Sequence, residues 1–323
     1  MDNINFKTPI LLIIFNRPHL TETVFNVIKK IKPEKLYIAS DGPRIDRKDL
    51  EKVKLARKIA TNVNWKCQVK KLFRENNLGC GAGPIDAINW LFENENTGII
   101  LEDDCVPSPS FFYYCEALLK KFEHNENIAS IHGNNFQNGR LFGDGSYYYS
   151  KYFHGWGWAS WSRVWKNYDK KMTFWPSWRD SNDFYQKFPN FYDRTYWRNI
   201  FDLVYENKIS QDDVWDYQFL AYIIKNGGVN IAPNYNLVSN IGFGKDATHT
   251  RDSKNKRANL FANELNKLVH PSSKIEINKR ADLFDFYNHY LGKFKILPIL
   301  LKNYPYYMLK KIKINFKKLF KQN

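Results

Sequence analysis

The chain has 323 residues, 43% of them hydrophobic and 17% aromatic, which is enough for one large α/β domain or two small ones with a substantial core. The four cysteines show neither CxxC spacing nor histidines placed for zinc, so we expect reduced structural thiols, as in a cytosolic protein. The net charge of +16 indicates an anionic partner, and without a recognisable nucleic-acid-binding motif a membrane surface is favoured over nucleic acid.

Strand and helix patterns alternate over the first hundred residues. Short apolar runs bounded by turn signals predict strands at residues 9–15, 35–40, 68–73 and 98–101. Amphipathic stretches between them predict helices at residues 20–31, 47–62 and 81–94, and we expect Thr21 or Thr23 to cap the first. This alternation predicts an α/β fold with a mostly parallel central sheet flanked by helices.

The apolar run at residues 9–15 is too short to span a membrane. It has no basic segment before it and no small-residue cleavage site after it, so we expect a buried strand rather than a signal peptide. Polar or glycine-rich residues follow each predicted strand. Parallel sheets bind their ligands at that edge, so a nucleotide would lie there.

Residues 97–106 are an apolar run that ends abruptly in Glu102, Asp103 and Asp104. Three adjacent carboxylates repel one another, and Mg²⁺ or Mn²⁺ would offset that repulsion while keeping phosphate oxygens in its shell. The segment therefore predicts a site for a metal ion and a phosphate. The alternative is a solvated acidic turn after a strand.

The pattern changes after residue 109. We expect a helix at 110–124 and a strand at 128–133, then an aromatic region over 140–200 without clear periodicity. A helix at 215–225 and a strand at 229–232 follow. We interpret residues 1–135 as a nucleotide-binding half and 136–260 as an acceptor-facing half of one domain. Residues 261–323 would form a C-terminal helical, basic and amphipathic region.

The end of the chain is strongly basic. No acidic residue follows Asp285, and lysines alternate with apolar residues up to Lys321, at helical spacing from Tyr306 on. This pattern is typical of an amphipathic helix lying on anionic lipid. The alternative is a C-terminal helix that docks on the domain and leaves its lysines in solvent.

Seven segments together resemble nucleotide-sugar glycosyltransferases of the GT-A fold, a Rossmann-like architecture. The chain is similar to the bacterial HlpA-like sugar transferases and, more distantly, to the Golgi N-acetylglucosaminyltransferase that begins hybrid N-glycan branching. The segments are PILLIIFNRP, LYIASDGPR, FRENNLGCG, ILEDDCVPSPSFF, HGWGWASWSRVW, WDYQ and NIAPNYNLVSNIGFGKDATHT, within residues 9–250.

The resemblance implies a set of donor-binding residues near the first three strands. It places Asn16 and Arg17 against the nucleotide, and Asp41 where a carboxylate accepts a hydrogen bond from uracil. Arg74 and Asn77 lead into a glycine-rich helix start that would face the ribose or the diphosphate. Each also has a simpler interpretation as a surface charge or a turn residue.

The acidic triplet matches the DXD element of such enzymes. The resemblance puts Asp104 on Mn²⁺ or Mg²⁺, with Glu102 and Asp103 towards the ribose or the waters of the metal ion. Trp156 or Trp158 would form a platform beside the donor sugar, with an aromatic core residue as the alternative. His249, after a flexible glycine segment, would contact the diphosphate or the metal ion.

An inverting transfer also needs a base that takes the proton of the acceptor hydroxyl. The resemblance favours Asp216 in WDYQ, with Asp212 and Asp213 as close rivals, and the alternative is that these acids cap the following helix.

The sequence as a whole predicts a metal-dependent, inverting glycosyltransferase that uses a UDP-sugar of the UDP-GlcNAc type. Its acceptor would be a hydroxyl of a bacterial surface glycan, lipooligosaccharide or capsule, at the cytoplasmic face of the inner membrane. One alternative is a sugar nucleotidyltransferase, although FNRP stands where such enzymes carry a glycine-rich signature. The other is a non-catalytic, membrane-associated protein that binds nucleotide-sugars.

Overall fold

The computed structural model describes residues 6–44, 48–244 and 256–291. Within these ranges one mixed sheet has the strand order β3-β2-β1-β4-β8-β6-β9-β7. Its strands are β1 (Ile10–Ile14), β2 (Lys35–Ser40), β3 (Gln68–Phe73), β4 (Thr97–Glu102), β6 (Ile128–His132), β7 (Tyr147–Ser150), β8 (Trp158–Trp161) and β9 (Val229–Pro233).

The strands β1 to β4 are parallel, and β6 and β9 run in the same direction, because β8 is antiparallel to both β4 and β6. The flanking helices include α1 (Pro18–Ile31), α2 (Leu50–Ala60), α3 (Gly79–Asn94), α4 (Pro109–Lys121) and α9 (Asp216–Lys225). The predicted α/β class with a mostly parallel, helix-flanked sheet is confirmed, and its carboxyl edge is where β1, β2 and β4 end together.

The first strands form where the apolar runs predicted them. Ile10, Leu11 and Leu12 are fully buried in β1, as expected for a central strand covered on both faces. The predicted threonine cap of α1 is wrong. The helix begins at Pro18, whose missing N–H suits a first helical position, and Thr21 and Thr23 lie inside it.

Residues 140–200 contain more regular structure than their sequence predicts. Besides β7 and β8 they form the helices α5 (Ser162–Trp165), α6 (Trp175–Trp178), α7 (Asn182–Lys187) and most of α8 (Phe191–Tyr205). Trp158, Trp175 and Trp197 are fully buried and pack against other aromatic rings. Because aromatic residues fill both sides of these short elements, the sequence shows no alternation of polar and apolar positions.

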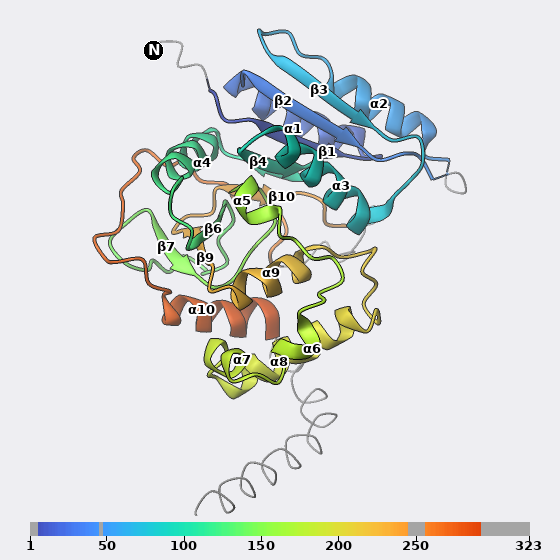
Figure 1. Cartoon of the computed structure of the whole chain (residues 1–323). Coiled ribbons are helices and arrows are strands. Elements are labelled where there is room, and N and C mark those ends of the chain that lie inside the picture. The colour runs from blue at the N-terminus through green and yellow to red at the C-terminus, as the bar shows by residue number, and fades with distance from the viewer. Residues whose placement is uncertain (1–5, 45–47, 245–255, 292–323) are drawn as a thin grey trace, which may run out of the picture.

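A small second sheet pairs β5 (Cys105–Pro107) with β10 (Val238–Asn240) in antiparallel fashion. This pairing brings the segment 238–244 next to the acidic triplet. The helix α10 (Lys279–Asp285) continues into a π-helix, η2 (Phe286–Leu291). Figure 1 shows α10 with α7 and α8 at one end of the molecule, and β3 and α2 at the other.

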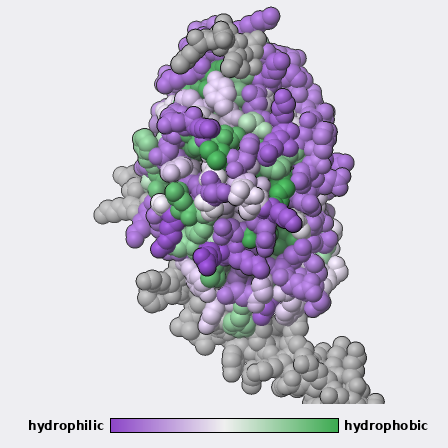
Figure 2. Space-filling view, turned by 90° about the vertical axis from the view of Figure 1, so that its left-hand side faces the viewer, coloured by the Kyte–Doolittle hydropathy of each residue, from purple (hydrophilic) through white to green (hydrophobic). Residues whose placement is uncertain are grey.

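The surface is mostly hydrophilic, with smaller hydrophobic patches on the face shown in Figure 2. The four cysteines form no disulfide. Among the described residues, none of the helices has the length and apolar character needed to span a membrane. The predicted basic segment beyond residue 291 lies outside the described residues, as does His249.

Candidate functional site

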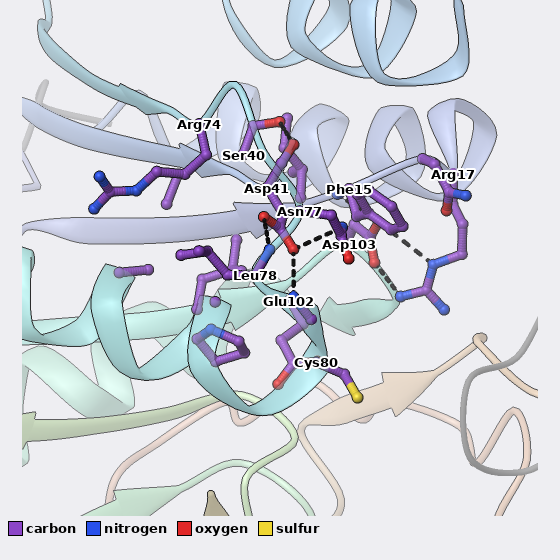
Figure 3. A pocket seen from close by; sticks show the side chains of 18 of the residues that line it. Phe15, Arg17, Ser40, Asp41, Arg74, Asn77, Leu78, Cys80, Glu102 and Asp103 are labelled. Carbon is purple, nitrogen blue, oxygen red and sulfur yellow. Dashed lines mark hydrogen bonds and ion pairs between the residues drawn. The ribbon is translucent and has the colours of Figure 1, made fainter. Parts of the chain in front are cut away.

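A cleft of about 810 Å³ lies at the carboxyl ends of β1 to β4, a size typical of small-molecule sites (Figure 3). It forms where the parallel strands of the sheet end and loops lead into α1 and α3. Its lining brings together eight of the residues singled out in the sequence, namely Asn16, Arg17, Asp41, Arg74, Asn77, Glu102, Asp103 and Asp213.

The acidic triplet closes β4 and is held by Arg17, the residue that precedes α1. The Arg17 guanidinium forms an ion pair with Asp103, and its Nη1 lies 2.9 Å from Oδ2 of Asp104. The N–H of Phe15 donates a further hydrogen bond to Asp103 over 3.4 Å. One guanidinium therefore bridges two of the three carboxylates, which leaves the group with excess negative charge.

The electrostatics of the triplet reflect this excess. Burial, and then the charge of Asp104, raises the pKa of Glu102 above its usual range, while Arg17 acts to lower it. Burial also raises the pKa of Asp103, and Arg17 offsets part of that rise. Burial alone would lower the pKa of Arg17, but the charges of Asp103 and Asp104 outweigh it and raise that pKa. The site thus favours additional positive charge.

Asp104 is enclosed by the segment that follows β10. The Nδ2 of Asn240 lies 3.5 Å from its Oδ1, and the N–H of Ile241 donates to its carbonyl over 2.9 Å. Gly242 approaches the carboxylate so closely that a Cβ atom there would clash with it. The backbone at position 242 therefore lies so close to the Asp104 carboxylate that only glycine can be accommodated there.

This donor set fits a hard divalent cation that completes its shell with phosphate oxygens. Among the described residues no three acidic, histidine or cysteine side chains converge into a protein-only cage. Mg²⁺ commonly takes one or two carboxylates together with substrate phosphates, and to be one of them Asp104 would exchange its ion pair with Arg17 for the metal ion. Asp104 is the residue that would hold the ion.

Asp41 ends β2 and organises the loop that leads into α3. Its Oδ1 accepts hydrogen bonds from the N–H groups of Gly42 and Leu78, both at 2.8 Å. Its Oδ2 accepts from the N–H of Gly79 at 3.0 Å and from Nδ2 of Asn77 at 2.9 Å. These four bonds fill the acceptor positions of one carboxylate. A base N–H would therefore have to replace one of them in order to bind here.

Arg57 supports the same loop and was not singled out in the sequence. From α2 it donates to the carbonyl of Arg74 at 2.6 Å, to that of Asp41 at 3.1 Å and to the Ser40 hydroxyl at 2.9 Å. Nothing in its helical sequence context separates it from a solvated arginine, so only the fold reveals this role. Arg74 itself forms an ion pair with Asp86.

Asn16 belongs to a polar cluster with Asp49 and Arg44 at the cleft, which the sequence did not indicate. Its Nδ2 donates to Asp49 over 2.7 Å, and Asp49 also accepts a 2.6 Å bond from Nε of Arg44. The Arg44 guanidinium lies 5.0 Å from the centre of the Phe15 ring. These residues add a cationic and aromatic wall at the end of β1.

The three candidate bases differ in position. Asp212 is 73% exposed, its carboxylate lies 2.6 Å from Lys170, and it does not line the cleft. Asp213 lines the cleft beside Cys80. Asp216 opens α9, and its charge is one of those that raise the pKa of Glu102, so these two carboxylates are within electrostatic reach.

Trp156 does not line the cleft and is packed between other aromatic rings. Its ring centre is 5.2 Å from that of Phe136 and 5.6 Å from that of Phe243. Phe243 follows Gly242, so Trp156 borders the segment that encloses Asp104.

No family model matches the sequence, and no curated protein matches it. The solved structures that match it include three with low sequence identity and low TM-scores. HddC from Yersinia pseudotuberculosis is 8% identical over 52% of this chain and 85% of its own, with a TM-score of 0.30. A 4-diphosphocytidyl-2C-methyl-D-erythritol synthase from Anaerococcus prevotii is 9% identical over 68% and 97%, with a TM-score of 0.31.

The third structure is a UTP-bound UGPase from Acinetobacter baumannii, 9% identical over 68% of this chain and 93% of its own, with a TM-score of 0.28. At these identities and scores the likenesses carry no argument about chemistry. The fold class rests on the sheet order and strand directions given above.

Proposed function

We propose that this protein is a metal-dependent, inverting glycosyltransferase that takes a sugar from a UDP-sugar. The observation that carries the proposal is that the acidic residues near the carboxyl edge of the sheet form two separate sets, the triplet after β4 and Asp216 at the start of α9. Glu102, Asp103 and Asp104 are partly neutralised by Arg17, whereas Asp216 lies at an exposed helix start within electrostatic reach of Glu102. A cation-binding end and a separate candidate base are the two parts that this transfer needs.

In this proposal Asp104 holds Mn²⁺ or Mg²⁺, which when bound supplies positive charge to the departing diphosphate. Arg17 pairs with the phosphates, and the loop clamped by Asp41 positions the nucleoside. Asp216 takes the proton of the acceptor hydroxyl while its oxygen forms the new bond to the anomeric carbon. The bond from that carbon to the diphosphate breaks at the same time, so the configuration inverts.

The sequence resemblance supports UDP as the nucleotide and a bacterial surface glycan as the acceptor. The basic end of the chain supports work at the cytoplasmic face of a membrane, where a lipid-linked acceptor of this kind would lie.

The test is release of free nucleoside diphosphate from a panel of nucleotide-sugars, with Mn²⁺ or with EDTA. We expect turnover of one UDP-sugar with Mn²⁺, and loss of at least about a hundredfold in Asp104→Ala and in Asp216→Asn. Asp216→Asn should still bind UDP with Mn²⁺. Asp212→Asn is the matched control and should retain activity, because its carboxylate faces Lys170.

Two results would overturn the proposal. One is the absence of metal-dependent turnover or UDP binding by the folded wild-type protein. The other is release of pyrophosphate from UTP and a sugar 1-phosphate, which would identify a nucleotidyltransferase instead. Thermal unfolding of each variant separates loss of chemistry from loss of fold.

A further inference from the structure

The outward side of α10 and η2 combines exposed apolar and cationic side chains. Leu283 is 45% exposed and Tyr287 is 40% exposed, one helical turn apart on the same side. Lys279 and Arg280 are exposed at the start of this side. The adjacent loop adds Arg140 and Leu141, since the Arg140 guanidinium lies 3.9 Å from the centre of the Phe284 ring. We call these six residues the outer face.

The acidic residues of α10 point the other way and hold the element in place. Asp282 accepts a 2.6 Å hydrogen bond from the Ser150 hydroxyl of β7, and Asp285 lies 2.7 Å from Nε2 of His154. Ala281 and Phe286 are buried on this inner side. The outer face is therefore fixed on the folded domain, and its charge is positive because its acids are turned inward.

The chain that follows η2 has a matching chemistry in its sequence. Residues 292–323 include nine lysines and no acidic residue, interspersed with leucine, isoleucine, phenylalanine and tyrosine. These thirty-two residues directly follow η2 in the sequence. Positive charge combined with exposed apolar side chains is the chemistry that binds anionic lipid.

We propose that the outer face of α10 and η2 docks the protein on an anionic bilayer, in line with the basic composition of the sequence that follows it. Leu141, Leu283 and Tyr287 enter the headgroup region, and Lys279, Arg280 and Arg140 contact lipid phosphates. A nucleic-acid partner of the basic segment would leave these three apolar side chains without a role, and the combination of positive charge with apolar side chains is the one that binds anionic lipid.

The side of η2 opposite the docking surface packs towards the candidate base. On the inner side of η2, Tyr290 packs against Trp197 with ring centres 4.8 Å apart, and Trp197 also contacts Tyr217, the neighbour of Asp216, at 6.4 Å. If the proposed transfer is correct, on which this step rests, docking brings a lipid-linked acceptor to the Asp216 side of the cleft.

The test is flotation of the full-length protein with vesicles of phosphatidylcholine alone or with 30% phosphatidylglycerol. We expect binding to the anionic vesicles, a decrease of about tenfold in partition between 0.1 and 0.5 M NaCl, and little binding to the neutral ones. The double variant Leu283→Ser/Tyr287→Ser should bind the anionic vesicles about tenfold more weakly.

Two further variants make the test specific to this surface. Leu50→Ser/Leu55→Ser changes two leucines that are each 49% exposed on α2, at the opposite end of the molecule, and should bind as the wild type does (Figure 1). Glutamine in place of Lys310, Lys311, Lys317 and Lys318 should also weaken binding. Unfolding curves check that each variant is folded.

The proposal is overturned if the Leu283/Tyr287 variant binds like the wild type, which would assign membrane binding to the basic segment alone. It is also overturned if no variant binds anionic vesicles, or if RNA competes binding away as well as lipid does. UDP release without vesicles should be unchanged in the Leu283/Tyr287 variant, so failure of the docking surface is distinguishable from failure of the transferase proposal.

Discussion

Replacing Asp41 by asparagine tests whether one carboxylate organises the cleft. The side chain keeps its shape, but one of its two acceptor oxygens becomes an NH₂ group. Whichever end is replaced, two donors lose their acceptor, either the N–H groups of Gly42 and Leu78 or those of Gly79 and the Asn77 side chain. The NH₂ group of the asparagine then faces these N–H donors, and no hydrogen bond can form between them.

The cost follows from the number and kind of the lost bonds. Hydrogen bonds to a charged group contribute about 1.5–3 kcal/mol each, and Asp41 is half-buried, so the lower end of that range applies. Two lost bonds should reduce the free energy of unfolding by about 3 kcal/mol. Leu78 and Gly79 stand where α3 begins, so the loss is expected to loosen the loop before this helix first.

Guanidinium unfolding and amide hydrogen exchange measure the two effects separately. We expect a lower unfolding midpoint for Asp41→Asn and faster exchange at the amides of Leu78 and Gly79. The matched control is Asp86→Asn, where a carboxylate paired with Arg74 is 37% exposed and its loss should cost no more than about 1 kcal/mol. Equal midpoints for the two variants, with unchanged exchange at Leu78 and Gly79, would refute the reasoning.

Two further predictions concern the acidic triplet and the buried histidines. Gly242→Ala should lower the affinity for Mn²⁺·UDP about tenfold by calorimetry, because its Cβ would displace the Asp104 carboxylate. The control Gly155→Ala, whose Cβ meets nothing closer than 3.4 Å and which does not line the cleft, should bind normally, and equal affinities would contradict the role of Gly242. Burial holds the pKa of His132 and His289 well below 6.5, so below that pH the unfolded chain takes up more protons than the folded one and stability is lost. The unfolding midpoint of His132→Gln should therefore fall less between pH 7 and pH 5 than that of the wild type, and an equal fall would show that this imidazole is charged in the folded state.

Local patterns in the sequence were sufficient for the nucleotide-facing half of the fold. The segments of β1 to β4 are short and bounded by turn residues, and those of β1 and β4 are rich in isoleucine, so the strands and the place of Glu102 at the end of β4 follow from neighbouring residues alone. Their alternation with helices predicted that they run parallel. Asp41 and Arg17 follow from the same logic, since Asp41 directly follows β2, Arg17 lies in the short loop after β1, and the carboxyl ends of parallel strands meet at one edge.

The tertiary structure alone decided how the remote segments complete that edge. Asn240 and Gly242 reach Asp104 only because β10 pairs with β5 across more than 130 residues of chain, and no local signal encodes such a pairing. The aromatic region 140–200 hides its strands and helices because side chains buried on all sides erase the polar alternation that sequence patterns depend on. The electrostatic reach of Asp216 to Glu102, and the inward turn of the acids of α10, depend on how helices pack against a completed sheet, which is a property of the whole chain and not of any one segment.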